Sequence, residues 1–324
     1  MKRSLFFIPI FLFISIVFSC NAEKSNSGQK VIESEDIASL LKKKETVYFE
    51  ELTITGDLNF TAVSEEYIEA MGTFRSHIAS SVTFINCRFE GEIKAYLKDD
   101  QRFQHMCTFK KNISFINCTF DKEVNFRDCV FEGIANFSGS EFAEKAVFEG
   151  ALFDINNTYF STCIFGDYAR FQRTQFNGNA NFVKSEFRGI CNFQSSFFTG
   201  EARFGACKMF QNVDFSMASF QYGIFLNYTE FNANFTFNNN QVLGRAEFIN
   251  CQFQGAAEIK NSQFFGIVKL NEAKFFNSLL LEDIVFIAGK PITDGLTIEK
   301  NATLTLSRIT YNSPVELNQK DFLK

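Results

Sequence analysis

The sequence of 324 residues has no tryptophan, three prolines and two histidines. No Cys-x-x-Cys pair occurs and only His77 and His105 could supply imidazole ligands, so we predict no bound metal and no cofactor. Nucleophile motifs and phosphate-binding loops are missing from the sequence too, and we predict no catalytic residue. The 32 Lys and Arg against 37 Asp and Glu give a net charge of −5, without the strongly signed field that a nucleic-acid partner would need.

The first twenty residues have the layout of a secretory signal. Lys2 and Arg3 precede an apolar run from Leu5 to Phe18, which is shorter than the roughly 20 residues that cross a bilayer comfortably. The run ends at Ser19-Cys20, which resembles a bacterial lipobox, where the Cys is diacylated and becomes the mature N-terminus. We therefore predict a lipoprotein signal peptide over 1–19, a membrane anchor through the lipid on Cys20 and a flexible tether over 20–30. A plain signal peptide cleaved nearby is the alternative.

The predicted anchor also predicts where in the cell the protein lies. Asn21 follows the Cys in place of the Asp that commonly retains lipoproteins at the inner membrane. We expect a lipid-anchored protein of the cell envelope, at the outer rather than the inner membrane.

Phenylalanine, by contrast, accounts for 45 residues and recurs at alternating spacings of five and six from Phe109 to Phe286. We call these sites the ladder positions, and 27 of the 33 are Phe. The others are also apolar, so burial rather than the chemistry of the ring defines them: Met209, Leu226, Val242, Ile259, Leu270 and Leu281. A period of eleven residues kept for about sixteen cycles is typical of a solenoid.

The residue two before each ladder position is small or β-branched. Because residues two apart in extended chain share a face, each short strand should send one large and one small side chain inward. Eight cysteines occupy this small position: Cys87, Cys107, Cys118, Cys129, Cys163, Cys191, Cys207 and Cys251. We interpret them as buried structural thiols rather than disulfides or metal ligands. Glycines such as Gly133 and Gly189 lie in the six-residue steps, where we expect a positive φ.

The triplets Ala135-Asn136-Phe137, Ala180-Asn181-Phe182 and Cys191-Asn192-Phe193 resemble the pentapeptide-repeat family, and the resemblance extends over about residues 80–286. It implies an all-β fold, a right-handed quadrilateral parallel β-helix with four five-residue sides per coil. The sixth residue on alternate sides of this chain raises the expected coil to about 22 residues.

Breaks in the ladder locate the irregular parts. One residue is added between Phe153 and Phe160, and nine extra residues before Phe115 predict a projecting loop at 97–105. Ser34 and the apolar stripe that follows it predict a capped helix over the open N-terminal end. We expect these domains: an N-terminal cap over 31–70 with this helix and a first irregular coil, the β-helix over 71–287, and a C-terminal cap over 288–324 with two further strands.

Three function classes remain. A β-helix polysaccharide-acting enzyme would need clustered acids and bases in a cleft, and the loop offers only a charged, solvated set: Asp99, Asp100, Arg102 and His105. A DNA-mimic regulator of a topoisomerase, as known in the family, is opposed by export and by a balance of 18 acidic and 15 basic residues between Phe109 and Phe286.

We therefore expect a non-catalytic envelope lipoprotein whose solenoid is a scaffold or binding surface for a protein or glycan. An end-to-end homodimer is an alternative use of its C-terminal end. The interaction surface is predicted from aromatic side chains that should face outward: Phe197, Phe210, Phe225, Phe265 and Phe276.

Overall fold

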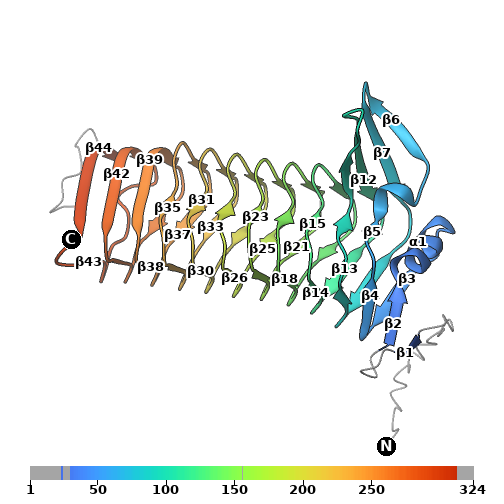
Figure 1. Ribbon diagram of the computed structural model, residues 1–324. Coiled ribbons are helices and arrows are strands. Elements are labelled where there is room, and N and C mark those ends of the chain that lie inside the picture. Colours follow the sequence, from blue (N-terminus) through green and yellow to red (C-terminus); the bar gives the residue numbers. More distant parts are fainter. Residues whose placement is uncertain (1–22, 25–29, 155, 312–324) are drawn as a thin grey trace, which may run out of the picture.

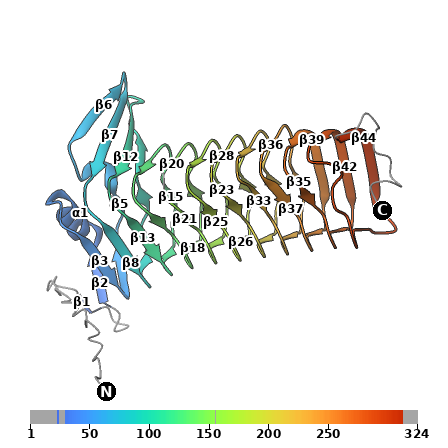
Figure 2. The ribbon, with the colours of Figure 1, turned by 180° about the vertical axis from the view of Figure 1, so that it is seen from behind.

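A computed structural model describes residues 23–24, 30–154 and 156–311. In this part of the chain the backbone winds as a parallel β-solenoid, an elongated rod with one α-helix and two projecting hairpins at its N-terminal end (Figure 1). One face of the rod is a sheet of 13 strands. At about 4.8 Å between coils, the rod is roughly 50–60 Å long. Figure 2 shows the hairpins at the same end from behind.

The length of each coil is the one that the ladder predicts. Strand β13 (Ile113–Ile116) pairs in parallel with β17 (Ala135–Asn136), so that Ile113 lies beside Ala135 one coil later. Phe115 consequently stacks on Phe137, with ring centroids 5.7 Å apart. All 33 ladder positions are buried, which makes the stacked rings the core of the rod.

Four stacks of strands form the sides of the rod. Side one contains β3 (Val47–Glu50), β8 (Val82–Ile85), β13, β17, β21 (Thr158–Tyr159), β25 (Ala180–Asn181), β29 (Ala202–Arg203), β33 (Gly223–Phe225), β37 (Arg245–Glu247) and β40 (Val268–Lys269). Side two contains β2 (Lys30–Glu33), β4 (Leu52–Thr55), β9 (Arg88–Phe89), β14 (Thr119–Phe120), β18 (Glu141–Phe142), β22 (Ile164–Phe165), β26 (Glu186–Phe187), β30 (Lys208–Met209), β34 (Glu230–Phe231), β38 (Gln252–Phe253), β41 (Lys274–Phe275) and β43 (Thr297–Ile298).

Sides three and four carry the other two ladder columns of each coil. Side three contains β5 (Leu58–Asn59), β10 (Ile93–Lys94), β15 (Val124–Asn125), β19 (Ala146–Val147), β23 (Ala169–Arg170), β27 (Cys191–Asn192), β31 (Val213–Asp214) and β35 (Phe235–Thr236). Side four contains β7 (Thr73–Ile78), β12 (Gln104–Phe109), β16 (Val130–Phe131), β20 (Leu152–Phe153), β24 (Gln175–Phe176), β28 (Phe197–Phe198), β32 (Ser219–Phe220) and β36 (Gln241–Val242). Near the C-terminal end both sides run through single nine-residue strands: β39 (Ala256–Phe264), β42 (Ser278–Phe286) and β44 (Thr303–Tyr311).

The extra residue before Phe160 leaves the core undisturbed. Ala135 pairs with Ile113 in the preceding coil and with Thr158 in the following one, and the second separation along the chain is longer by one residue. Phe160 still stacks on Phe137, with centroids 4.9 Å apart and rings 3° from parallel. The solenoid therefore absorbs an insertion at a corner, outside the stacked rings.

Positive φ angles occur, but not on the glycines predicted to carry them. In each five-residue step the residue two after the ladder position is left-handed, for example Asn117 (φ 52°) and Lys184 (φ 61°). Gly133 and Gly189, in the six-residue steps, are absent from this set, so that prediction is wrong. A Cβ on Gly189 would lie 1.7 Å from the carbonyl oxygen of Asp167 in the preceding coil. Close approach of two backbones, rather than a left-handed turn, requires glycine there.

The eight cysteines at the small position are free and buried, as predicted. The structure adds a polar role for the thiol. Cys163 Sγ donates a hydrogen bond to the carbonyl oxygen of Phe137 at 3.0 Å, and Ser185 Oγ donates to that of Phe160 at 2.6 Å. Cysteine, serine and threonine thus fit a site that requires a small side chain, as alanine does at Ala218, and each of the three can also donate one hydrogen bond to the preceding coil.

The asparagines of the repeated triplets also have a structural role. Asn181 Oδ1 accepts the backbone N–H of Val183 at 3.0 Å, and Asn192 Oδ1 accepts that of Gln194 at 2.8 Å. This local hydrogen bond turns the chain at the corner that follows the ladder position. The outward polar residue of the repeat is therefore accounted for by folding.

The helix at the N-terminal end is α1 (Ser34–Lys42), as predicted, with Ile37 and Leu41 buried. Its capping differs from the prediction. Ser34 is the first helical residue and is buried, while the N-cap is Glu33, which makes no side-chain cap. The reason is that β2 continues to Glu33, which pairs with Thr55, so the helix begins directly at the strand's end. Among the described residues, no helix is long and apolar enough to cross a bilayer.

The projecting segment before Phe115 is a β-hairpin rather than an irregular loop. Strand β11 (Tyr96–Lys98) pairs antiparallel with β12, and residues 99–103 form only the connection. A second hairpin, β6 (Glu66–Ala70) and β7, lies beside it because β7 pairs in parallel with β12. We call these four strands the paired hairpins; they stand out from side four in Figure 1.

Two further strands follow residue 288, as the alternation of apolar residues predicts. Strand β43 pairs with β41, and β44 pairs with β42 along its whole length, from Ser278 beside Thr303 to Phe286 beside Tyr311. Ile309 of β44 is buried against the end of the core. The described part of the C-terminal segment therefore adds one more coil to the rod.

Candidate functional site

The predicted interaction aromatics lie on three sides of the rod, outside any single patch. Phe197 is in β28 on side four and Phe265 directly follows the end of β39 there, whereas Phe225 is in β33 on side one. Phe210 and Phe276 directly follow side-two strands three coils apart. Only Phe210 is exposed, at 41%, and the others are half-buried. The guanidinium carbon of Arg245 lies 5.8 Å from the Phe225 ring centroid. Cys20 lies outside the described residues.

The charged set at 97–105 falls into two groups in the β11–β12 hairpin: two residues are in contact with each other and two are exposed. His105 Nδ1 lies 2.7 Å from Glu66 Oε1, and its Nε2 lies 3.4 Å from Asp99 Oδ2. Burial alone would lower the pKa of His105, but hydrogen bonds to the two carboxylates outweigh it and raise the pKa. Asp100 and Arg102 are exposed. The imidazole therefore ties the tip of one hairpin to the first strand of the other.

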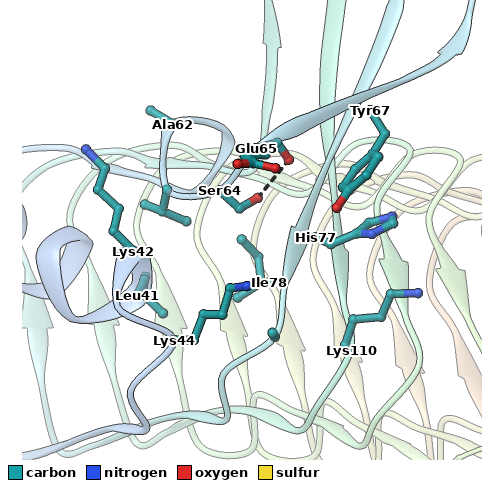
Figure 3. A pocket seen from close by; sticks show the side chains of 12 residues that line it. Leu41, Lys42, Lys44, Ala62, Ser64, Glu65, Tyr67, His77, Ile78 and Lys110 are labelled. Carbon is teal, nitrogen blue, oxygen red and sulfur yellow. Dashed lines mark hydrogen bonds between the residues drawn. The ribbon is translucent and has the colours of Figure 1, made fainter.

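A pocket of about 670 Å³ lies at the base of the paired hairpins, and we call it the N-terminal pocket (Figure 3). It lies between the end of α1, the segment from the 3₁₀ turn η1 (Phe60–Ala62) into β6, and the end of β7. Its lining is Leu41, Lys42, Lys44, Ala62, Val63, Ser64, Glu65, Tyr67, His77, Ile78, Ala79 and Lys110. Leu41, Val63 and Ile78 are buried and give it an apolar floor.

The polar groups of the pocket are mostly cationic. Three lysines line it against one carboxylate, Glu65, in a chain of net charge −5. Lys110 Nζ is engaged by Glu132 Oε1 at 2.6 Å. Among the described residues Lys44 has no ion-pair or hydrogen-bond partner for its ammonium. Figure 3 shows the Lys44 side chain pointing into the space beside Ile78, while Lys42 and Lys110 point away from it.

Local structure fixes the two sides of the pocket. Lys44 follows the helix end with φ 59°, and its backbone N–H donates to the carbonyl oxygen of Leu41 at 2.9 Å. On the opposite side the rings of Tyr67 and His77 stack, with centroids 4.7 Å apart and planes at 25°. Burial, followed by the positive charge of Lys110, lowers the pKa of His77, so this imidazole is neutral at pH 7.

Sequence reasoning missed this pocket because the pocket depends on the β6–β7 hairpin. Two strand-like runs flank Met71-Gly72, and Gly72 has φ 75°, the turn signal that could have revealed the hairpin. The pocket offers an apolar floor, a stacked aromatic pair and a free ammonium. Among the described residues no group of three His, Cys, Asp or Glu side chains could hold a metal ion.

The similarity to known proteins lies in the solenoid and does not include the N-terminal pocket. No curated protein and no solved structure matches the chain. Residues 105–141, 115–157 and 160–208 match the sequence model of a family described as pentapeptide repeats (9 copies). These segments form the middle of the rod, where the coils and their stacked rings are most regular. Residues 105–208 thus contain the pentapeptide repeats of that family, and the parallel pairing of successive coils continues through the rest of the described rod.

Proposed function

We propose that this protein is a non-catalytic, lipid-anchored rod of the cell envelope, whose outer surface is a scaffold or binding surface for a protein or glycan. One observation carries the proposal. Apart from Met106 and Val147, the buried apolar residues form a single cluster from Ile32 to Ile309, so the interior of the described rod is used for packing. Groups available to a partner therefore lie on the outer sides, in the paired hairpins and in the N-terminal pocket.

The charged residues that would favour an enzyme have another role in the fold. Glu66 and Asp99 both bind His105, and this contact joins the two hairpins. Asp99 and His105 are absent from the lining of the N-terminal pocket. This arrangement supports a structural role for the imidazole.

The proposed anchor would hold the rod by one end. Glu23 of β1 (Glu23–Lys24) pairs with Val31 of β2, so the chain already lies beside the first coil at residue 23. Glu23 is three positions along the chain from Cys20, a separation of at most about 10 Å. A lipid on Cys20 would therefore keep the hairpin end of the rod near the membrane, with β44 at the far end. We propose the outer membrane as that membrane.

Replacing the proposed lipid site tests the anchor. The variant Cys20→Ser removes the thiol that carries the lipid, so we expect no incorporation of a labelled palmitate analogue and a chain that keeps residues 1–19. Mass spectrometry of the chain and its label measures both. The matched control is Cys163→Ser, which alters a buried thiol and should label like the parent chain. A Cys20→Ser chain that still carries the label would refute the anchor.

Crosslinking in intact envelopes tests the scaffold role. We expect a defined protein or glycan crosslinked to the outer sides of the rod. The same crosslinked species should be missing when the envelope is opened and washed before the crosslinker is added. A homotypic crosslink through β44 would indicate end-to-end pairing instead. Recovery of no defined species under several growth conditions would contradict the scaffold role.

A further inference from the structure

We propose that the N-terminal pocket binds a sugar ring that carries a carboxylate, as in an acidic glycan. The inference rests on the proposed function only in taking a glycan as the partner, since the pocket depends on neither the lipid nor the outer sides of the rod. The pocket volume of about 670 Å³ is in the usual range for small-ligand sites and would hold one or two sugar rings.

The charge of the pocket selects an anion. The Lys44 ammonium lies at the end of α1 and is directed inward, and Lys42, which also has no ion-pair partner among the described residues, adds positive charge at the rim (Figure 3). Lys110 is paired with Glu132, so the excess positive charge comes from Lys44 inside the pocket and Lys42 at its rim. A carboxylate placed at this ammonium gains a charge-assisted hydrogen bond beside the apolar floor of Leu41, Val63 and Ile78.

The remaining walls favour a sugar as the carrier of that carboxylate. The Tyr67–His77 stack presents a flat aromatic face on which the C–H side of a sugar ring can pack. The hydroxyls of Tyr67 and Ser64 lie on the same side, and Figure 3 shows the Tyr67 hydroxyl turned towards the pocket. Inorganic phosphate would use the cation but leave the floor and the aromatic face unused. An acidic peptide would use the cation as well but has no flat C–H face for the aromatic stack.

Titration of the full-length chain in detergent with defined probes tests the proposal. We use a galacturonic acid trisaccharide, the neutral glucose trisaccharide, inorganic phosphate and hexaglutamate, each followed by calorimetry. We expect the acidic trisaccharide to bind and the other three to bind at least about 10-fold more weakly. Equal binding of the neutral sugar, of phosphate or of hexaglutamate would overturn the proposal.

Matched lysine variants locate the site. Lys44→Gln should weaken binding of the acidic trisaccharide about 10-fold or more, because the charge-assisted bond is lost while an unbranched polar side chain, one bond shorter, is kept. Lys43→Gln alters the exposed neighbour outside the lining and should bind like the parent chain. Both lysines are exposed, so we expect unchanged thermal unfolding. Similar losses in both variants, or in neither, would contradict the assignment.

The pH dependence gives an independent measurement. His77 faces Lys110 and Arg75 as cations and Glu132 and Glu69 as carboxylates, and its pKa is lowered in the free chain. The negative charge of the bound acidic trisaccharide favours the protonated imidazole, so affinity should rise from pH 8 to pH 6. His77→Gln should remove most of this rise, and a pH-independent affinity would count against the site.

The two proposals fail separately. Loss of acidic trisaccharide binding would leave the palmitate labelling and the crosslinking experiments unaffected. Failure of Cys20 to carry a lipid would leave the titrations of the pocket unchanged.

Discussion

At the residue scale, cysteine fits one site of the repeat because the thiol is small, and it also donates a hydrogen bond there. Cys251 Sγ donates to the carbonyl oxygen of Leu226 at 3.0 Å, and Thr229 Oγ1 donates to that of Phe204 at 2.6 Å. Burial raises the pKa of the Cys163 and Cys251 thiols to about 12. The thiolate is the reactive form, so these cysteines are inert in the folded chain at neutral pH.

This burial predicts a pH dependence of stability. The folded pKa of Cys163 is raised above the unfolded value of about 8.5, so its share of stability is complete below pH 8.5 and is lost as the pH rises towards 12. In that range the free energy of unfolding should fall by about 1.4 kcal/mol per pH unit for this thiol. Cys163→Ser keeps a donor, as at Ser185, but does not ionise, so its slope should be shallower by that amount. Urea unfolding between pH 8 and 10.5 measures both slopes, and equal slopes would contradict the argument.

At the element scale, glycines have two different roles. Some form turns within a coil, and others allow the backbones of neighbouring coils to come close. Gly139, in a five-residue step, has φ 73°, and its equivalents in other coils include Asn117 and Asn250 with φ 52° and 56°. Gly189, in a six-residue step, lies against the backbone of Asp167. The first kind serves a turn that asparagine can also adopt, and the second kind serves the spacing of neighbouring coils.

A pair of substitutions distinguishes the two kinds. Gly189→Ala would place a Cβ 1.7 Å from a backbone oxygen, so two coils must move apart and we expect a loss of about 3 kcal/mol or more in unfolding free energy. Gly139→Asn meets only the Asn117 side chain, which can rotate, and should change stability by about 1 kcal/mol or less. Chemical denaturation of both variants measures the difference. A smaller effect at Gly189 than at Gly139 would show that the coils are not held by backbone contact.

The elements also show where sequence reasoning succeeds and where it ends. Phe115 and Phe137 share a column because a local spacing repeats, and such a period can be counted along the chain. The left-handed residue of each five-residue step could not be located in this way, because Lys184, Ser195 and Ala206 all adopt this conformation without a common side chain. The N-terminal pocket was out of reach for a further reason. Lys44 and His77 line the same pocket only because β6 pairs with β7, and this hairpin lies outside the range of the ladder positions. Such tertiary pairing cannot be read from a local spacing.

At the scale of the whole molecule, the rod is a stack in which each coil contacts its neighbours. Pairing runs from one coil to the next, as from β25 to β29 and from β29 to β33. Stability is then close to a sum over coils and the interfaces between them. The insertion before Phe160 shows that one side can contain an additional residue while the rings stay stacked. Each side still needs its five or six residues to reach the next ladder position.

This geometry predicts that the rod can lose a coil but cannot be shortened within one. Deleting residues 180–201 removes one full coil and joins Asn179 to Ala202, which restores a six-residue step from Phe176 to Phe204. We expect a folded rod about 5 Å shorter, with cooperative unfolding and a modest loss of stability. Deleting residues 180–203 instead leaves a step of four residues, too short to cross a side, so later strands cannot keep their register with earlier ones. Thermal unfolding and X-ray scattering compare the two chains. A cooperative transition in the second deletion would show that the sides tolerate contraction, and would remove the basis for reading the coil length from the ladder.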